Sequence, residues 1–313
     1  MKSYIKFISL CALALLFIQD VPARADFKAA VAAYRSKDFP TAFKEAQKAS
    51  NAGDIKAQLI LGLLYLNGQG TPKDIKKALL WYNKAADQGH KGAQFDLGVL
   101  YATGRVGKQD INKARSYFER AAKGGHMLAQ YNLGLVYVKI AKTKVDWQYA
   151  AHWFGKAAVQ GHPQAQYDLG ALYLEGKGVG KNPTTAAAWI LKAAQKGLPA
   201  AELEYALMVF KGHGVQKNEK VAGQWLLSSA NRGNVVAQNH IAKLYNAGRG
   251  VKLDQIEAAR WRMLAKAAGL KDDKFDAIIA KLSKQELAEA KRRVENWYLA
   301  HPRARQRIRR RVN

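Results

Sequence analysis

The chain has 313 residues, of which 51 are lysine or arginine and 24 are aspartate or glutamate, so its formal net charge is +27 at pH 7. A basic excess of this size attracts polyanions and anionic surfaces without sequence specificity. The one cysteine, Cys11, lies near the N-terminus, so a mature chain without this segment has no disulfide and depends on a hydrophobic core for its stability.

Residues 1–25 have the pattern of a secretory signal peptide. Two lysines precede an apolar run over residues 7–18, and Ala23-Arg24-Ala25 offers small residues where a signal peptidase cuts. We expect cleavage after Ala25, no transmembrane segment in the mature chain, and a periplasmic or secreted location in a bacterium. An uncleaved membrane anchor is the alternative, which the shortness of the apolar run disfavours.

Residues 26–56 are expected to form a degenerate first repeat that covers the N-terminal end of the array. The stretches 27–34 and 41–50 have helical patterns, and Asp38 and Gly53 lie at the positions of helix caps.

Residues 57–270 repeat one pattern every 36 residues, six times. Each repeat opens on an alanine and closes on a glycine, and most carry Leu-Gly-x-x-Tyr in the first half. A fixed period of this size is typical of a solenoid, in which each helix pair buries its apolar face against its neighbours. The opening alanines are Ala57, Ala93, Ala129, Ala165, Ala201 and Ala237, and the closing glycines are Gly89, Gly125, Gly161, Gly197, Gly233 and Gly269.

One repeat is expected to fold as two antiparallel helices. Gly62 lies inside the first helix, where it predicts the close approach of a second helix. Asp74 has the chemistry of an N-cap, and Gly89 that of a C-terminal residue with positive φ. The recurring tryptophans have alanines at helical spacing and are therefore expected to be buried between helices; they are Trp81, Trp153, Trp189, Trp225 and Trp261.

The repeated pattern resembles that of the Sel1-like repeat family. The pattern is A-x-x-x-L-G-x-x-Y-x-x-G-x-G followed by D-x-x-K-A-x-x-W/Y-x-x-K-A-A-x-x-G-H, and residues 57–90 match nearly all of it. The resemblance implies an all-α fold, a right-handed α/α superhelical solenoid of TPR-like helix-turn-helix repeats. It also implies a scaffold or adaptor for protein–protein interaction. Tetratricopeptide arrays are the nearest alternative, but their period is 34 residues.

Residues 271–300 break the repeat pattern and are expected to form a two-helix cap. Ser283 and Glu286 have the spacing of a capping box for its second helix. Residues 301–313 are expected to form a disordered tail, which either only aids solubility or makes a weak contact with polyanions. The candidate polyanion-binding residues are Arg303, Arg305, Arg307, Arg309, Arg310 and Arg311.

The sequence has no Gly-x-Ser-x-Gly elbow, His-Glu-x-x-His pair or phosphate-binding loop. His90, His126 and His162 occupy one repeat position, but helices of successive repeats are about 8–10 Å apart, too far for these imidazoles to share one metal ion. We therefore expect no catalytic residue, no cofactor, no metal site and no enzymatic activity.

Polar side chains recur at one position of the first helices, namely Asp96, Asn132, Asp168 and Glu204. This position is interpreted either as a partner-binding surface on the concave face or as a merely solvated helix face. Trp147, beside the unusual loop of the third repeat, is a candidate exposed anchor. We expect an exported monomer that binds another protein in the cell envelope. The alternative is a basic protein that binds polysaccharide, lipopolysaccharide or nucleic acid.

Overall fold

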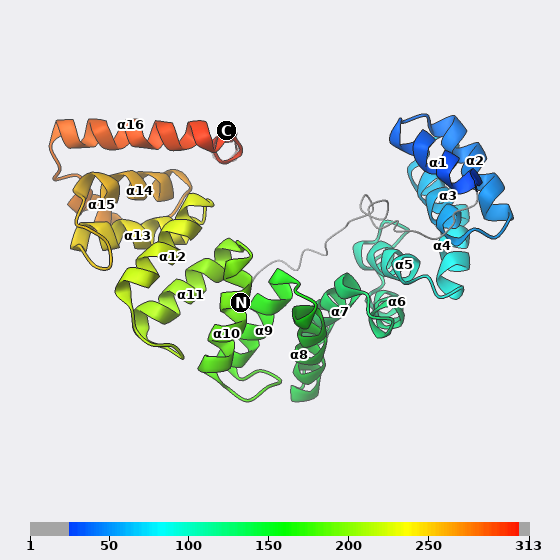
Figure 1. Ribbon diagram of the computed structural model, residues 1–313, viewed down its shortest axis with the longest axis horizontal. Helices are drawn as coiled ribbons and strands as arrows, with labels where there is room; N and C mark the ends of the chain where they lie inside the picture. Colours follow the sequence, from blue (N-terminus) through cyan, green and yellow to red (C-terminus); the bar gives the residue numbers. More distant parts are fainter. Residues whose placement is uncertain (1–24, 307–313) are drawn as a thin grey trace. The chain divides into compact units, whose positions relative to one another are not determined.

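The computed structural model describes residues 25–306, which form sixteen α-helices (Figure 1), a further short helical segment at residues 302–306 and no strand. The chain divides into two compact units, with the boundary between Gln160 and Gly161. Within each unit, every helix up to α15 packs against the next along the chain, and α16 packs against α14. The expected fold class, an all-α solenoid of helix-turn-helix repeats, is confirmed. No helix of the described range has the length and apolar character needed to cross a membrane.

Unit 1 consists of four helix pairs. Their bounds are α1 (Ala25–Arg35), α2 (Phe39–Asn51), α3 (Ile55–Asn67), α4 (Ile75–Asp87), α5 (Lys91–Thr103), α6 (Ile111–Lys123), α7 (Met127–Ile140) and α8 (Lys144–Val159). Unit 2 consists of three helix pairs and two further helices. Their bounds are α9 (Pro163–Glu175), α10 (Pro183–Gln195), α11 (Pro199–Lys211), α12 (Glu219–Asn231), α13 (Val235–Ala247), α14 (Gln255–Ala267), α15 (Asp273–Ile279) and α16 (Lys284–Ala300).

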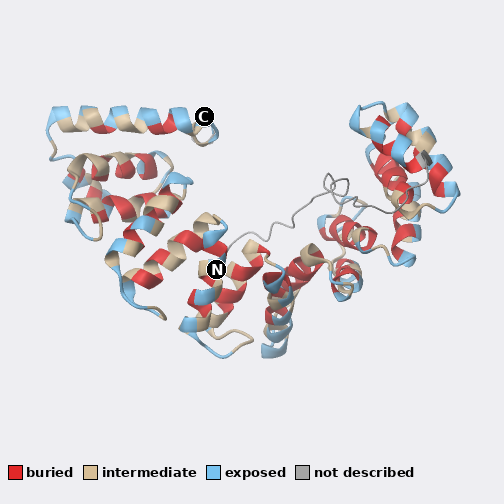
Figure 2. Ribbon diagram, in the orientation of Figure 1, coloured by how far each residue is buried: buried red, intermediate tan, exposed pale blue. Residues whose placement is uncertain are grey.

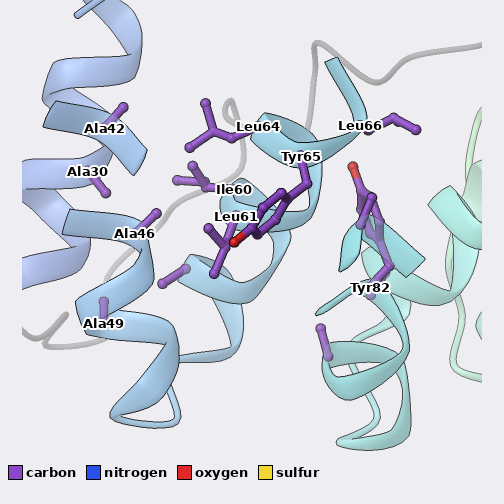
Figure 3. Close-up of a cluster of buried hydrophobic side chains, with 14 of the residues drawn as sticks. Ala30, Ala42, Ala46, Ala49, Ile60, Leu61, Leu64, Tyr65, Leu66 and Tyr82 are labelled. Carbon is purple, nitrogen blue, oxygen red and sulfur yellow. The ribbon is translucent and has the colours of Figure 1, made fainter. Parts of the chain in front are cut away.

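The core of each unit lies between neighbouring helices, whose facing sides are buried while the loops are mostly exposed (Figure 2). Small side chains let the helices approach closely. Figure 3 shows this at the start of unit 1, where Ala42 and Ala46 of α2 lie beside Leu61 and Leu64 of α3; all four are fully buried.

The first and second helices of a repeat touch through the glycine of the first helix. A Cβ atom added to Gly98 would lie 2.5 Å from the ring of Phe118 on α6, and one added to Gly134 would lie 2.5 Å from the ring of Phe154 on α8. A Cβ atom at either position would force the facing ring to shift, so the predicted close approach is confirmed. Ala206 and Ala242 take the glycine's place in the last two repeats.

The aromatic residue that meets this glycine is not the one expected from the sequence. It is the next residue along the second helix, as in Tyr82 beside Gly62. One residue turns the side chain by about 100° around the helix axis, which is enough to move it from one face to the next. The expectation of buried tryptophans was therefore wrong for Trp81, Trp153, Trp189 and Trp225, which are half-buried, and right for Trp261.

Cations cover the outer faces of two of these half-buried rings. The Nζ of Lys84 lies 4.2 Å from the ring centroid of Trp81, and the Nζ of Lys192 lies 4.0 Å from that of Trp189. A cation over an indole face is attracted by the ring quadrupole, so part of the recurring positive charge stabilises the second helices.

The N-caps of the second helices follow the prediction in five repeats. The side chain of Asp74 accepts a hydrogen bond from the backbone N–H of Lys77, 2.9 Å away, and Asp110, Asn182, Asn218 and Asp254 do the same in their own helices. The third repeat departs from the cap predicted on Asp74, because the equivalent residue, Asp146, is not the N-cap of its second helix. Its α8 starts earlier, with Thr143 as N-cap and Asp146 as the third helical residue of a capping box.

In the last repeat, Arg262 holds the second-helix position at which Phe118 and Phe154 contact the first helix of their own repeats. The Arg262 side chain is 1% exposed and lies 2.6 Å from Asp276 of α15, and it also donates to the backbone carbonyl of Leu270. On the neighbouring helix, Lys243 and Asn239 hold Asp272, and these bonds lower the pKa of Asp272 to about 2. Charged contacts therefore tie the end of the array to α15.

The final helix, α16, packs along α14 (Figure 1). Its predicted capping box is confirmed, since Ser283 accepts from the N–H of Glu286 while the Glu286 carboxylate accepts from Ser283. Residues 302–306 form a further helical turn in which Arg305 pairs with Glu295 at 3.0 Å. The tail was predicted to be disordered from residue 301, and for this turn that prediction was wrong.

The remaining terminal predictions fall outside the described residues. These are the signal peptide before Ala25 and the tail arginines Arg307, Arg309, Arg310 and Arg311.

We expect Arg262→Ala to destabilise unit 2 by about 3 kcal/mol, because it leaves the Asp276 carboxylate without its buried partner. Arg292→Ala serves as the control, since Arg292 is exposed and its pair with Glu289 is expected to contribute less than about 1 kcal/mol. Urea denaturation followed by tryptophan fluorescence measures both. Equal midpoints for the two variants would contradict a structural role for the Arg262–Asp276 pair.

Candidate partner-binding surface

The side of each first helix that faces away from its second helix is fixed by the glycine contact. Gly98 faces Phe118, and successive residues are rotated by about 100°, so the Asp96 side chain leaves α5 about 160° away from α6. The residues of α5 on this side are Gly92, Asp96, Val99 and Thr103. We call this set of positions in each first helix the inner stripe.

In unit 1 two polar groups lie in the middle of the inner stripe, between apolar residues, while its ends carry the polar residues Lys56, Asn67, Thr103 and Lys139. Asp96 on α5 and Asn132 on α7 occupy the position that Ile60 holds on α3. Asp96 is 6% exposed and Asn132 is 1% exposed, so the interpretation of this position as a solvated helix face is wrong for both residues. Three residues further along, the stripe continues with Leu63, Val99 and Leu135, all buried.

The two buried polar groups lack the partners that burial usually requires. Asn132 Oδ1 has no hydrogen-bond partner, and no hydrogen bond or ion pair joins the Asp96 carboxylate to any described residue. Burial raises the pKa of Asp96 to about 7, because the charged form loses its hydration. An unpaired buried polar group costs stability, so these two residues are a local weakness of the fold.

In unit 2 the same position carries Asp168 on α9 and Glu204 on α11, and both are half-buried. Asp168 accepts a hydrogen bond from Gln164 at 3.1 Å. Both carboxylates lie near Tyr167, whose pKa is raised to about 12 by burial and by these two negative charges. The structure thus places Asp168 and Glu204 together beside Tyr167, whereas Asp96 and Asn132 hold equivalent positions on α5 and α7.

Trp147 lies in the first turn of α8 and is half-buried. The exposed apolar groups nearby are Val145 and Tyr149, which are 52% and 50% exposed. Tyr149 stacks on Tyr137 with ring centroids 5.0 Å apart. The early start of α8, with Thr143 as its N-cap, was not foreseen from the sequence.

The recurring histidines have a structural role that the sequence reasoning missed. The Nδ1 atoms of His90, His126 and His162 accept hydrogen bonds of 3.1–3.2 Å from backbone N–H groups three residues on, so each imidazole caps its first helix. The signal was present, because Asp54 and Asn234 hold the same repeat position. Over residues 25–306, no three His, Cys, Asp or Glu side chains are arranged to hold a metal ion.

A second missed feature is the glutamine that follows the opening alanine of the repeats. Gln94, Gln130 and Gln238 each donate from the side-chain amide to a carbonyl near the end of the preceding second helix, at 3.0–3.2 Å. In the fifth repeat Glu202 replaces it and pairs with Arg232 at 3.2 Å. The glutamine bonds join successive repeats within a unit and the Glu202–Arg232 pair lies within the fifth repeat, so this position serves packing rather than binding.

The histidine caps predict a loss of stability in mild acid. Burial lowers the pKa of His126 and of His162 from 6.5 to about 4, and it also lowers the pKa of His90. Between these pH values the unfolded chain binds protons that the folded chain does not, so the free energy of unfolding falls as the pH drops from 6.5 towards 4.

Replacing one cap by a residue that does not titrate tests this directly. We expect His126→Asn to reduce the loss of stability between pH 7 and pH 4 by about 1–2 kcal/mol, because asparagine caps a helix at any pH. Chemical denaturation at the two pH values provides the comparison. A variant whose stability changes with pH as the wild type's does would show that the imidazole cap carries no such effect.

Comparison with known proteins gives a consistent result. A family model described as the Sel1 repeat matches residues 55–90, 92–126, 128–162, 163–198, 199–234 and 235–268. No curated protein matches this chain.

Two solved structures are similar over most of the chain. One is a protective antigen of uropathogenic Escherichia coli strains with an SLR fold, which is 27% identical with a TM-score of 0.76 over 91% of this chain and 63% of its own. The other is a Sel1 repeat protein from Oxalobacter formigenes, also 27% identical, with a TM-score of 0.64 over 80% of this chain and 100% of its own. This chain therefore spans less than two thirds of the length of the Escherichia coli protein.

Proposed function

Because the chain belongs to the Sel1 repeat family, we propose that it is a scaffold without catalytic activity that binds another protein through its inner stripes. Stacked repeats present the same face of each first helix side by side, which creates an extended surface from short elements. Such a surface is suited to an elongated segment of a partner rather than to a small molecule.

The observation that carries this proposal is the pair of buried, unpaired polar groups at Asp96 and Asn132. Ile60 holds the same position in the preceding repeat, so the fold itself accepts an apolar side chain there. Polar groups that weaken a fold and are not needed by it are typical of binding sites.

We place this function in the cell envelope of a bacterium. The apolar run over residues 7–18 and the small residues before Asp26 support export.

A second candidate, polyanion binding, is supported by a row of exposed cations on the second helices of unit 1. Lys48, Lys84, Arg120 and Lys156 follow one another at intervals of one repeat, and each is exposed. Two features count against a strong contact, because Arg120 pairs with Asp87 and Lys84 lies over an indole ring. We therefore regard this row as a weak, salt-dependent contact at most.

A pull-down from envelope extract distinguishes the two candidates. We expect one protein to be retained by the wild type at both low and high salt, and to be lost by the double variant Asp96→Leu plus Asn132→Leu. This variant should fold, since Ile60 shows that an apolar residue fits there. The control is Lys84→Ala plus Lys156→Ala. If capture is broad, disappears at high salt and depends on the lysines instead, the polyanion function replaces the scaffold.

Export predicts the mass of the mature protein. If residues 1–25 are removed, the protein isolated from the envelope of its native host begins at Asp26, and intact-mass spectrometry will show the loss of these residues. A mass that includes Met1–Ala25 would mean that the segment is kept, and the protein would then be anchored rather than released.

A further inference from the structure

We infer that Asp96 and Asn132 form a site for a single arginine or lysine side chain of a partner segment that is otherwise apolar. This inference rests on the proposed scaffold function and specifies the chemistry of the segment that the inner stripe of unit 1 binds.

The two residues belong to neighbouring helices of one packed structure. Phe95 and Val99 of α5 share a hydrophobic cluster with Ala129 and Leu133 of α7, so the two first helices are held together. Asp96 and Asn132 hold equivalent positions on these helices. By the same helix geometry, both side chains leave on the side away from the second helices, which carry Phe118 and Phe154.

The free atoms of this pair are hydrogen-bond acceptors. Asn132 Oδ1 is buried without a hydrogen-bond partner, and burial, with no described cation or hydrogen-bond donor beside it, raises the pKa of Asp96. A guanidinium or ammonium group has only donors, and a cation beside a buried carboxylate offsets the cost of its burial. A group of this kind can donate hydrogen bonds to both residues, whereas an anionic or acceptor-rich ligand would donate none and would repel the Asp96 carboxylate.

The protein's own cations do not fill this role. Burial alone accounts for the raised pKa of Asp96, and no described lysine or arginine acts on it, although the chain carries 51 basic residues. A cation that arrives with a partner would lower that pKa again.

The surroundings define the rest of the partner segment. Ile60, Leu63 and Leu135 hold apolar positions of the inner stripe near the two polar groups and are 5–9% exposed. Apolar side chains on either side of the cationic residue would match this surface, because polar ones would lose their hydration without gaining a hydrogen bond.

Synthetic peptides test the inference with the full chain. One peptide, Leu-Ala-Leu-Arg-Leu-Ala-Leu with blocked ends, is compared with its counterpart in which citrulline replaces arginine, since citrulline has nearly the same shape but no charge. NMR titration, which follows the Asn132 side-chain amide, gives both affinities. We expect the arginine peptide to bind at least about tenfold more tightly, as measured close charge pairs suggest.

The variants assign the effect to one carboxylate. Asp96→Asn should remove the difference between the two peptides, whereas Asp87→Asn, which changes an exposed acid of α4, should keep it. Equal affinities of the two peptides for the wild type, or discrimination that survives Asp96→Asn, would overturn the inference. If neither peptide binds while the wild type still retains its envelope partner, the inference is wrong and the scaffold function stands. Loss of that partner alone, with peptide discrimination intact, would count against the function instead.

Discussion

The close approach of a glycine on each first helix to a large side chain on the second determines the rest of this structure. Where a Cβ atom on Gly98 would come within 2.5 Å of Phe118, the rotation of the first helix is fixed. Once that rotation is set, the side of the helix that is left for other purposes is set too. The position of Asp96 is therefore a geometric result of a packing contact on the opposite side of α5.

Much of this architecture could be predicted from the sequence because the period repeats every local rule six times. The glycine inside the first helix, the Asp or Asn caps and the capping box at Ser283 each depend on neighbours within one or two turns. The tryptophans were misplaced because the helical period defines a broad apolar face without choosing between adjacent members of it. Trp81 and Tyr82 both fit that face, and only the packed structure shows that Tyr82 meets Gly62.

The position of the candidate site in the repeat could be predicted from the sequence, but the burial of its side chains could not. The recurrence of Asp96, Asn132, Asp168 and Glu204 follows from the repeat register, yet their burial depends on how neighbouring helices pack, which differs between the two units. Thr143 was missed because its capping box replaces a glycine turn that the other repeats share. The burial of Arg262 was missed because the sequence alone does not show that Asp276, fourteen residues further on, pairs with it.

The buried Arg262 also limits how the number of repeats in such a protein can change. Repeat arrays grow by duplication, and a copy of α13 and α14 inserted before the cap would place a first helix where α15 now lies. The inner copy of Arg262 would then lack Asp276 and remain as an unpaired buried cation, a state that a small domain rarely tolerates. Duplication of an earlier repeat carries no such penalty, because its core position holds Phe118, Phe154 or Ile190. Arg262 therefore restricts the repeat that carries it to the position directly before the C-terminal cap.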